Sequence, residues 1–188
     1  MKTVKAARIH NYDGAKAVRV EDTTVPKPQS GELLVRVHAA GVNSIDCKIH
    51  AGYLQQLTPL QLPFTLGGDF SGVVHAVGRD VAGCKVGDEV YGLASVFNDG
   101  SGSFAEFCLA QASAVALKPR GLSHVEACGL PTAGVSALQA LMESLRLSAG
   151  QEILLMAARA PSAASVFNSP NTSGRMSLRL PAPLTSLT

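Results

Sequence analysis

At 188 residues, 46% hydrophobic and 16% charged, the chain is long enough for one well-buried domain and too short for two of ordinary size. Its net charge of +2 comes from its end, because residues 156–188 carry three arginines and no lysine or acidic residue, which leaves −1 for residues 1–155. This local basicity gives no reason to expect a nucleic-acid partner. The cysteines form no close C-x-x-C pair, so we expect reduced thiols, packed mostly in the core: Cys47, Cys84, Cys108 and Cys128.

The beginning of the chain, MKTVKAARIHNYDG, lacks the continuous apolar segment of a signal peptide. No window approaches the roughly 20 apolar residues of a membrane span. We therefore expect a cytoplasmic protein with no membrane contact.

Short segments with strand character dominate the first two thirds of the chain. They are rich in Val, Ala or aromatic residues and are bounded by Gly, Pro, Asp or Asn. In chain order they are KAARIHNY, AKAVRVEDTTVP, GELLVRVHAAGV, FSGVVHAVG, DEVYGLA and GSFAEFCLA. This pattern predicts an antiparallel sheet or a partly open barrel. In the third segment Leu34, Arg36 and His38 alternate with apolar neighbours, which predicts a strand with one solvated face and an exposed or edge position for His38.

Helical signals follow. In LSHVEACGL, Ser123 and Glu126 stand at capping-box spacing. In TAGVSALQALMESLRL, one helical face collects Val135, Leu138, Leu141, Met142 and Leu145. The next segment, LSAGQEILL, predicts a turn and then a strand of the kind that begins a parallel, doubly wound sheet.

Two segments carry the residues with the most chemistry. The segment AAGVNSIDCKIHAGY places polar side chains directly after a strand, where a scaffold can hold a site: Asn43, Ser44, Asp46, Lys48, His50 and Tyr53. A solvated strand-to-helix connection, capped by Asn43 or Ser44, is an equal alternative. In LPFTLGGDFSGVVHAVG, turns and close backbone approach explain the glycines without any ligand.

Together these segments resemble the medium-chain dehydrogenase/reductase superfamily and, within it, the zinc-independent quinone oxidoreductases. The resemblance covers roughly residues 4–155, through GELLVRVHAAGVNSIDCKIHAGY, PFTLGGDFSGVVHAVG, VGDEVYG, GSFAEF and GLPTAGVSALQAL. It implies a mainly β fold with flanking helices: a GroES-like, partly open β-barrel and the first strand of an incomplete Rossmann α/β domain. Residues 1–130 would form the GroES-like catalytic domain, and residues 131–155 the interdomain helix and first Rossmann strand.

The resemblance also bears on metal binding. Zinc-dependent alcohol dehydrogenases of the superfamily carry a cysteine where this chain has Asn43, and a His-Glu pair where it has Gly68 and Asp69. A catalytic zinc needs three protein ligands and an open position, and neither a neutral amide nor a bare glycine replaces a thiolate or an imidazole. The four-cysteine structural zinc lobe is missing too. We therefore predict no metal and keep a zinc alcohol dehydrogenase as the third alternative.

The metal-free relatives transfer hydride from NADPH to a quinone or to an activated carbonyl or alkene, while the protein positions and polarises the reactants. The resemblance implies that Asn43, Asp46 and Tyr53 line the active-site cleft and that Thr132 touches the nicotinamide end of the cofactor. Asn43 would hydrogen-bond the cofactor or a substrate oxygen, and Tyr53 would donate to an oxygen that gains negative charge. A rim aromatic without such a role is the alternative for Tyr53. The implied partners are NADPH, a small quinone or enone and, in the full-length form, further copies in a homo-oligomer.

The end of the chain departs from this pattern. A Rossmann strand leads into a glycine-rich turn that holds the pyrophosphate, but MAARAPSAAS contains no glycine. Residues 156–188 show neither helical nor strand periodicity, so we expect an aberrant tail that is largely disordered or poorly packed. A natural short isoform, a disordered linker, a divergent fold and a reading-frame slip are the open explanations.

We favour the reading-frame slip. If one nucleotide was lost near Leu154 or Leu155, the codons of Met156 and Ala157 yield a glycine codon in the original frame. With third codon letters that the present residues permit, the original frame can then read H-G-G-A-G-A-V-G-S-F-G-V-Q-L-A-K-H-L-G-A-H-V-I. This sequence resembles the phosphate-binding turn of quinone reductases. One position does not fit: the shifted codon that spans Ala160 and Pro161 cannot encode the glycine that is usual at that place in the turn. We therefore expect this chain to lack most of its cofactor site and to be inactive alone; a non-enzymatic GroES-like binding or assembly module is the alternative.

Overall fold

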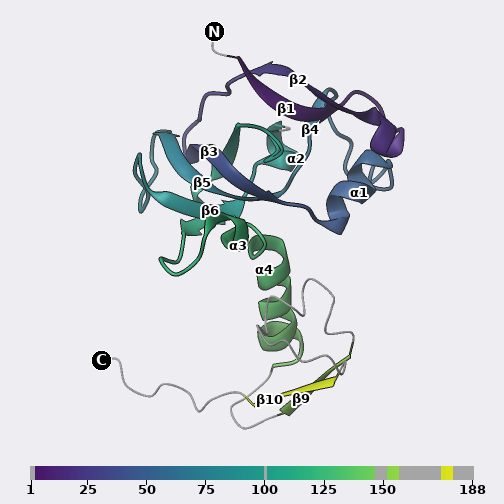
Figure 1. Ribbon diagram of the computed structural model, residues 1–188, viewed down its shortest axis with the longest axis vertical. Coiled ribbons are helices and arrows are strands. Elements are labelled where there is room, and N and C mark those ends of the chain that lie inside the picture. The colour runs from purple at the N-terminus through teal and green to yellow at the C-terminus, as the bar shows by residue number, and fades with distance from the viewer. Residues whose placement is uncertain (1–2, 100, 147–151, 157–174, 180–188) are drawn as a thin grey trace. The chain divides into compact units, whose positions relative to one another are not determined.

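The computed structural model describes residues 3–99, 101–146, 152–156 and 175–179. The chain divides into two compact units, Met1–Pro131 and Thr132–Thr188. The first unit holds two antiparallel sheets with short helices (Figure 1). This mainly β architecture confirms the fold class predicted from the sequence, and within the described residues the sheets are open and do not close into a barrel.

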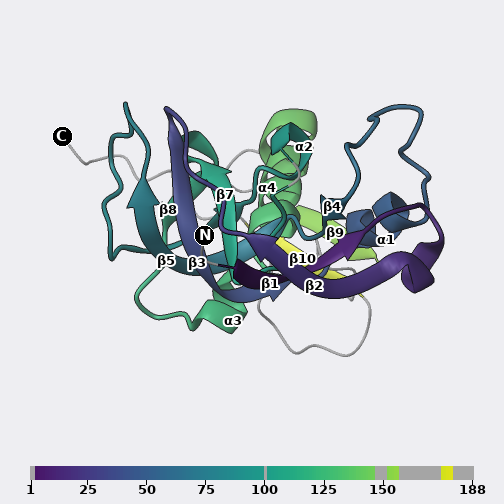
Figure 2. The same cartoon turned by 90° about the horizontal axis from the view of Figure 1, so that it is seen from above.

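The smaller sheet has the strand order β2-β1-β4. Its strands are β1 (Thr3–Ile9), β2 (Val18–Thr24) and β4 (Phe64–Thr65). A 3-10 turn, η1 (Gly14–Ala17), connects β1 to β2, and these two strands pair along their whole length (Figure 2). One hydrophobic core lies under this sheet and draws on α1 as well: Ile9, Ala17, Ile49, Phe64, Leu66 and Val96.

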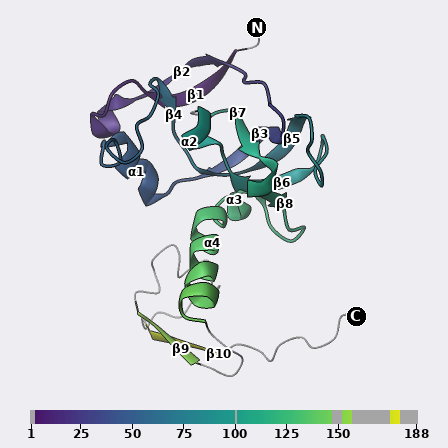
Figure 3. The same cartoon turned by 180° about the vertical axis from the view of Figure 1, so that it is seen from behind.

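The larger sheet has the strand order β7-β3-β5-β6-β8. Its strands are β3 (Glu32–Gly41), β5 (Asp69–Val77), β6 (Glu89–Leu93), β7 (Phe107–Gln111) and β8 (Val115–Leu117), the last joined to β7 by the 3-10 turn η2 (Ala112–Ala114). Strand β7 forms one edge and β8 the other (Figure 3). All neighbouring pairs are antiparallel.

The structure of strand β3 corrects the prediction that the face with Leu34, Arg36 and His38 is solvated along its whole length. Arg36 and His38 are exposed, as the alternation predicted, but Leu34 on the same face is only 4% exposed. Leu34 packs with Val4, Phe107 and Leu109 in a core of its own, while Leu33 and Val35 belong to the main core of the sheet. The first half of β3 is therefore covered on both faces, which a pattern within one strand does not reveal.

The helices of the first unit are short, and two of them begin at side-chain caps. Helix α1 (Ser44–His50) follows the N-cap Asn43, and α3 (His124–Ala127) follows the N-cap Ser123. Both carry a capping box, which for α3 is the Ser123–Glu126 pair predicted from the sequence. Helix α2 (Val96–Asp99) lies between β6 and β7, and α3 packs against β3 and β5.

The second unit holds helix α4 (Pro131–Gln139), whose first residue ends the first unit. A π-helical turn, η3 (Ala140–Ser144), continues α4, with Leu145 N–H donating to Ala140 O at 2.9 Å. The predicted helix is thus present, and four residues of its apolar face are exposed: Val135, Leu138, Met142 and Leu145. None of the described helices is both long and apolar enough to cross a membrane.

The strand predicted at the end of the chain is β9 (Glu152–Met156), but its pairing differs from the expectation. It pairs antiparallel with β10 (Arg175–Arg179), not in a parallel sheet. Strand β10 also lies in the segment for which no strand was expected, because cross-strand pairing can organise residues that lack periodicity of their own. The glycine-free stretch after Met156 lies outside the described residues.

Candidate functional site

The candidate site lies where three strands of the larger sheet end side by side. In the strand register Gly41, the last residue of β3, pairs with Asp69, the first residue of β5, and Asp69 pairs with Leu93, the last residue of β6. The chain leaves β3 through Asn43 into α1 and enters β5 through Gly67 and Gly68. Polar groups from both segments therefore meet at one edge of the sheet.

Asn43 and Asp46 are joined across the first turn of α1. The Asp46 Oδ2 atom accepts the backbone N–H of Asn43 at 2.8 Å, and the Asn43 Oδ1 atom accepts the N–H of Ile45 at 3.4 Å. Asn43 is half-buried, with extended backbone angles (φ −122°, ψ 157°) that suit an N-cap. The strand-to-helix alternative from the sequence therefore accounts for the local structure, whether or not the two side chains also contact a ligand.

Asp46 is a buried carboxylic acid, only 3% exposed. Burial raises its pKa from the ordinary value of 3.8, and the nearby charge of Asp69 acts in the same direction. Backbone groups of Asn43, Gly67 and Gly68 oppose this shift. Two buried carboxyl groups thus lie close enough to influence each other although they are far apart in the chain.

The Gly67–Gly68 turn is held firmly from both sides. Gly67 O accepts the Ser103 N–H at 2.8 Å, and Gly68 O accepts the Ala94 N–H at 2.8 Å. Gly67 has a positive φ of 99°, and a Cβ there would lie 2.5 Å from both Ser103 Oγ and Phe104 Cδ1. A Cβ on Gly68 would meet no atom within 4 Å. The turn therefore requires glycine at the first position and leaves open space at the second.

The C-terminal end of α3 closes the site from another side. A Cβ on Gly41 would lie 2.5 Å from the carbonyl oxygen of Cys128 and 3.0 Å from Asp69 Cβ. The Cys128 thiol is buried and donates to Val125 O at 3.2 Å, and burial together with the charge of Asp69 raises its pKa. It is therefore a protonated thiol and a poor nucleophile at neutral pH.

The remaining predicted site residues lie elsewhere. Tyr53 is in the turn after α1, where its N–H donates to Lys48 O at 3.0 Å, and its side chain is 76% exposed. Thr132 is the second residue of α4 and belongs to the second unit. The structure thus joins Asn43 with Asp46 and leaves Tyr53 on an exposed turn.

Two further residues of this edge were not predicted as site residues. Asp69 was noted in the sequence only as the residue at the position of a lost metal ligand, and Cys128 only as a core thiol. No local pattern links Asp69 to Asp46 or to Cys128, because strand pairing and the packing of α3 bring them together. The GGD sequence at the start of β5 is the one local signal that could have indicated Asp69.

The donor set of this edge suits hydrogen bonding better than metal ligation. The Asp46 carboxylate already accepts a backbone N–H, Asn43 offers only an amide, and Gly68 offers no side chain. Among the described residues, no group of three or more His, Cys, Asp or Glu side chains is placed to hold a metal ion.

Comparison with known proteins extends these observations. Residues 29–120 match the family model of the alcohol dehydrogenase GroES-like domain. The quinone oxidoreductase of Mus musculus is 33% identical over 155 residues, which are 82% of this chain and 45% of that protein. The 2-methylene-furan-3-one reductase of Solanum lycopersicum is 36% identical over 158 residues, 81% of this chain and 40% of that protein. The chain therefore spans less than half the length of either relative.

A solved structure shares the same fold. The mycobacterial protein Rv1454c, solved in complex with NADPH, superposes with a TM-score of 0.73 and 28% sequence identity. The match covers 87% of this chain and 48% of that one.

Proposed function

Because the chain is a quinone oxidoreductase-like member of the medium-chain dehydrogenase/reductase superfamily, we propose that it carries the GroES-like catalytic half of an NADPH-dependent reductase. The proposed acceptors are quinones and activated carbonyls or alkenes, without zinc. The names of the mouse and tomato relatives support these acceptor classes, and the NADPH complex of the mycobacterial protein supports the cofactor.

The observation that carries the proposal is the edge formed by Asn43, Asp46, Gly68 and Asp69. It combines a half-buried amide, a buried carboxyl group and open space beside Gly68, and it has no set of metal ligands. A reductase that uses a soluble hydride donor needs positioning and polarisation of the acceptor, which amide and backbone groups provide. Zinc catalysis would need a thiolate or imidazole ligand in place of Asn43 and of Gly68.

NADPH would supply the hydride. Asn43 would orient the cofactor or the acceptor oxygen through the amide N–H groups that the cap leaves available. Asp46 would act as a positioning residue, because its Oδ2 atom already holds the Asn43 backbone. Tyr53 would donate its exposed phenol proton to an oxygen that gains negative charge, and Thr132 would contact the nicotinamide. The glycine-rich turn that binds pyrophosphate in such domains has no counterpart among the described residues, so cofactor affinity of this chain alone should be low.

The test uses two proteins. One is the 188-residue chain, for which we expect little NADPH oxidation with benzoquinone or a cyclic enone. The other joins residues 1–155 to the remaining C-terminal part of the mouse quinone oxidoreductase, and we expect it to bind NADPH and to reduce at least one acceptor without added metal. Rapid quinone reduction by the 188-residue chain would overturn the expected inactivity. A chimera that binds NADPH but reduces neither acceptor, or that works only with bound zinc, would overturn the proposed reaction.

The compactness of the first unit supports a second candidate, a non-enzymatic binding or assembly module. Among the described residues, its hydrophobic cores draw on residues of that unit alone, so it can be stable without a cofactor domain. Cooperative unfolding of the 188-residue chain together with absent NADPH binding would favour this module. Assembly into a homo-oligomer stays a prediction from the sequence.

A further inference from the structure

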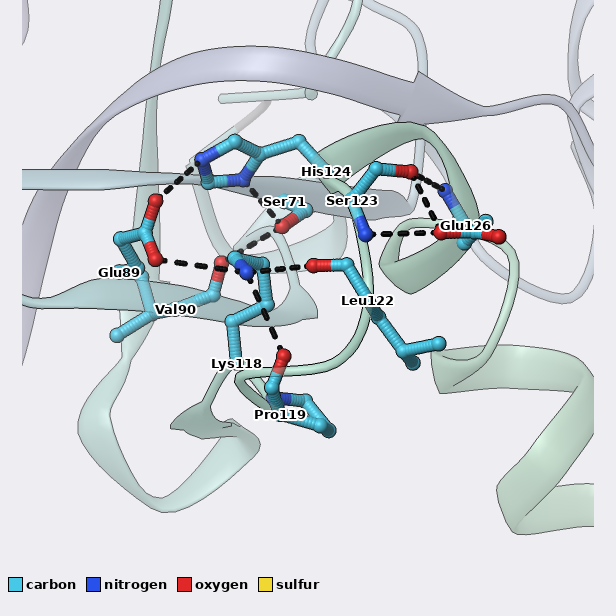
Figure 4. Close-up of polar contacts among 9 residues, drawn as sticks. All are labelled: Ser71, Glu89, Val90, Lys118, Pro119, Leu122, Ser123, His124 and Glu126. Atoms are coloured by element: carbon cyan, nitrogen blue, oxygen red, sulfur yellow. Dashed lines mark hydrogen bonds and ion pairs between the residues drawn. The ribbon is translucent and has the colours of Figure 1, made fainter.

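A polar cluster connects α3 to strands β5 and β6 of the larger sheet (Figure 4). The His124 ring lies between Ser71 of β5 and Glu89 of β6: its Nδ1 atom is 2.7 Å from Ser71 Oγ, and its Nε2 atom is 3.2 Å from Glu89 Oε1. The His38 ring of β3 lies beside it, with ring centroids 4.6 Å apart. This cluster is distinct from the candidate site, which lies at the other end of α3.

The cluster does not form a hydrolytic triad. Ser71 is fully buried, and its hydroxyl oxygen lies 3.0 Å from Val90 O, so it is closed to any substrate. A nucleophilic serine needs an exposed oxygen and a base that takes its proton. The arrangement therefore calls for a different explanation.

The proton count of the cluster depends on the charge of His124. Ser71 has one hydroxyl proton and two acceptors in reach, Val90 O and His124 Nδ1. If His124 is neutral and donates from Nε2 to Glu89, Nδ1 is an acceptor and the hydroxyl can donate to it. If His124 carries a second proton, Nδ1 becomes a donor, and the hydroxyl must turn to Val90 O. The three contacts His124–Glu89, His124–Ser71 and Ser71–Val90 can be made together only by the charged ring.

The surroundings of the ring oppose that charge. Burial lowers the pKa of His124 from 6.5, and His38 of β3 and Lys118, which follows β8, act in the same direction, against Glu89 of β6. Lys118 is held in place because its Nζ atom donates to Leu122 O at 2.6 Å and lies 3.4 Å from Glu89 Oε2 (Figure 4). Hydrogen bonding thus favours the charged ring of His124. Burial and the neighbouring positive charges favour the neutral ring.

We propose that His124 is a proton-dependent contact between α3 and the larger sheet, in which the Ser71 hydroxyl donates to Nδ1 when the ring is neutral and to Val90 O when the ring is charged. The lowered pKa of His124 means that burial and the neighbouring positive charges outweigh the hydrogen bonds gained on protonation, so the charged ring holds α3 less firmly than the neutral ring does. Since the other end of α3 packs on Gly41 at the candidate site, this contact makes the anchoring of that edge sensitive to pH. The proposal does not depend on the activity proposed above.

The first experiment measures the protonation state of His124 directly. Long-range proton–nitrogen NMR of the imidazole rings is recorded on the full chain between about pH 5 and pH 8, where histidine titrates. The His124→Gln spectrum identifies the His124 signals. We expect the Nε2–H tautomer in the neutral ring and a titration midpoint below 6.5. An Nδ1–H tautomer in the neutral ring would overturn the proposal, because Nδ1 would then never accept from Ser71.

Variants at exposed positions test the charges around the ring. Glu89→Gln removes the anion and should lower the midpoint, and His38→Gln removes a competing cation and should raise it. His10→Gln, which changes a histidine of the smaller sheet that contacts Glu21, is the matched control and should leave the midpoint unchanged. A midpoint that responds to neither Glu89→Gln nor His38→Gln would overturn the role of the cluster.

Hydrogen exchange tests the effect on α3. The amides of Ala127 and Cys128 donate to Ser123 O and His124 O, at 2.9 Å and 3.0 Å. Their protection, corrected for intrinsic exchange and compared with amides of β3, should fall severalfold as His124 gains its proton. The His124→Gln chain should show no such step. Protection that is the same on both sides of the titration would show that the contact does not control the anchoring of α3.

Discussion

The Asp46 carboxylate accepts the backbone N–H of Asn43 at 2.8 Å and thereby fixes the turn that leads from β3 into α1. The same two residues are the strongest candidates for contacts with cofactor or substrate. A capping role and a binding role therefore coincide in one pair of side chains. Substitutions that separate the two roles are the most informative at this site.

Asn43 allows such a separation. Asn43→Ala removes the cap and should lower the free energy of unfolding by about 1 kcal/mol, whereas Asn43→Ser keeps an N-cap oxygen and should cost much less. Urea denaturation of both variants measures this difference. If the amide also binds cofactor or acceptor, Asn43→Ser in the chimera should lose activity although its stability is retained. Full activity of that stable variant would limit Asn43 to capping.

Asp46 should make stability depend on pH. Its pKa is raised in the folded state, so the stability that its neutral form contributes is fully present below about 3.8 and is lost as the pH rises through the folded pKa. The wild type should therefore lose stability relative to Asp46→Asn, which cannot ionise, as the pH rises from about 3.8 through the raised pKa of Asp46. Urea midpoints at each pH give the comparison, with Asp13→Asn as a control at an exposed site. Parallel curves for wild type and Asp46→Asn would contradict this expectation.

Alanine substitutions at the two glycines before β5 should differ strongly in their effect on the free energy of unfolding. Gly67→Ala combines a positive φ with contacts to Ser103 and Phe104 that are too close, and should cost about 2 kcal/mol or more. Gly68→Ala enters open space and should change the free energy of unfolding by no more than about 0.5 kcal/mol. Thermal or urea unfolding distinguishes them. Equal losses would show that the space beside Gly68 is filled in solution.

The cysteines should differ sharply in reactivity. Cys47 is exposed on α1, whereas Cys108 and Cys128 are buried and burial raises the pKa of the Cys128 thiol. A maleimide should therefore label Cys47 rapidly in the native chain and reach the buried pair only on unfolding. Peptide mass spectrometry after timed labelling measures this, and Cys47→Ser should remove the fast reaction. Rapid native labelling of Cys128 would mean that α3 opens readily from the sheet.

Local chemistry made much of this fold predictable. Alternating apolar residues, turn residues and capping pairs act over a few positions, so the main strands and the cap of α3 could be inferred from the sequence alone. The very short strands β4 and β8 could not, because two or three residues carry too little pattern. The motifs that resemble quinone oxidoreductases pointed to the correct superfamily and to the edge that holds Asn43.

Only the tertiary structure decided which distant residues meet. The burial of Leu34, the influence of Asp69 on Asp46, the antiparallel pairing of β9 with β10 and the Ser71–His124 contact across 53 positions all depend on how elements pack. Periodicity and spacing report on neighbours along the chain, whereas burial and charge proximity are set by residues far away in sequence. The sequence by itself therefore determined the main strands, the capped helix and the family, whereas packing determined which ionisable groups of the first unit are buried or lie close together.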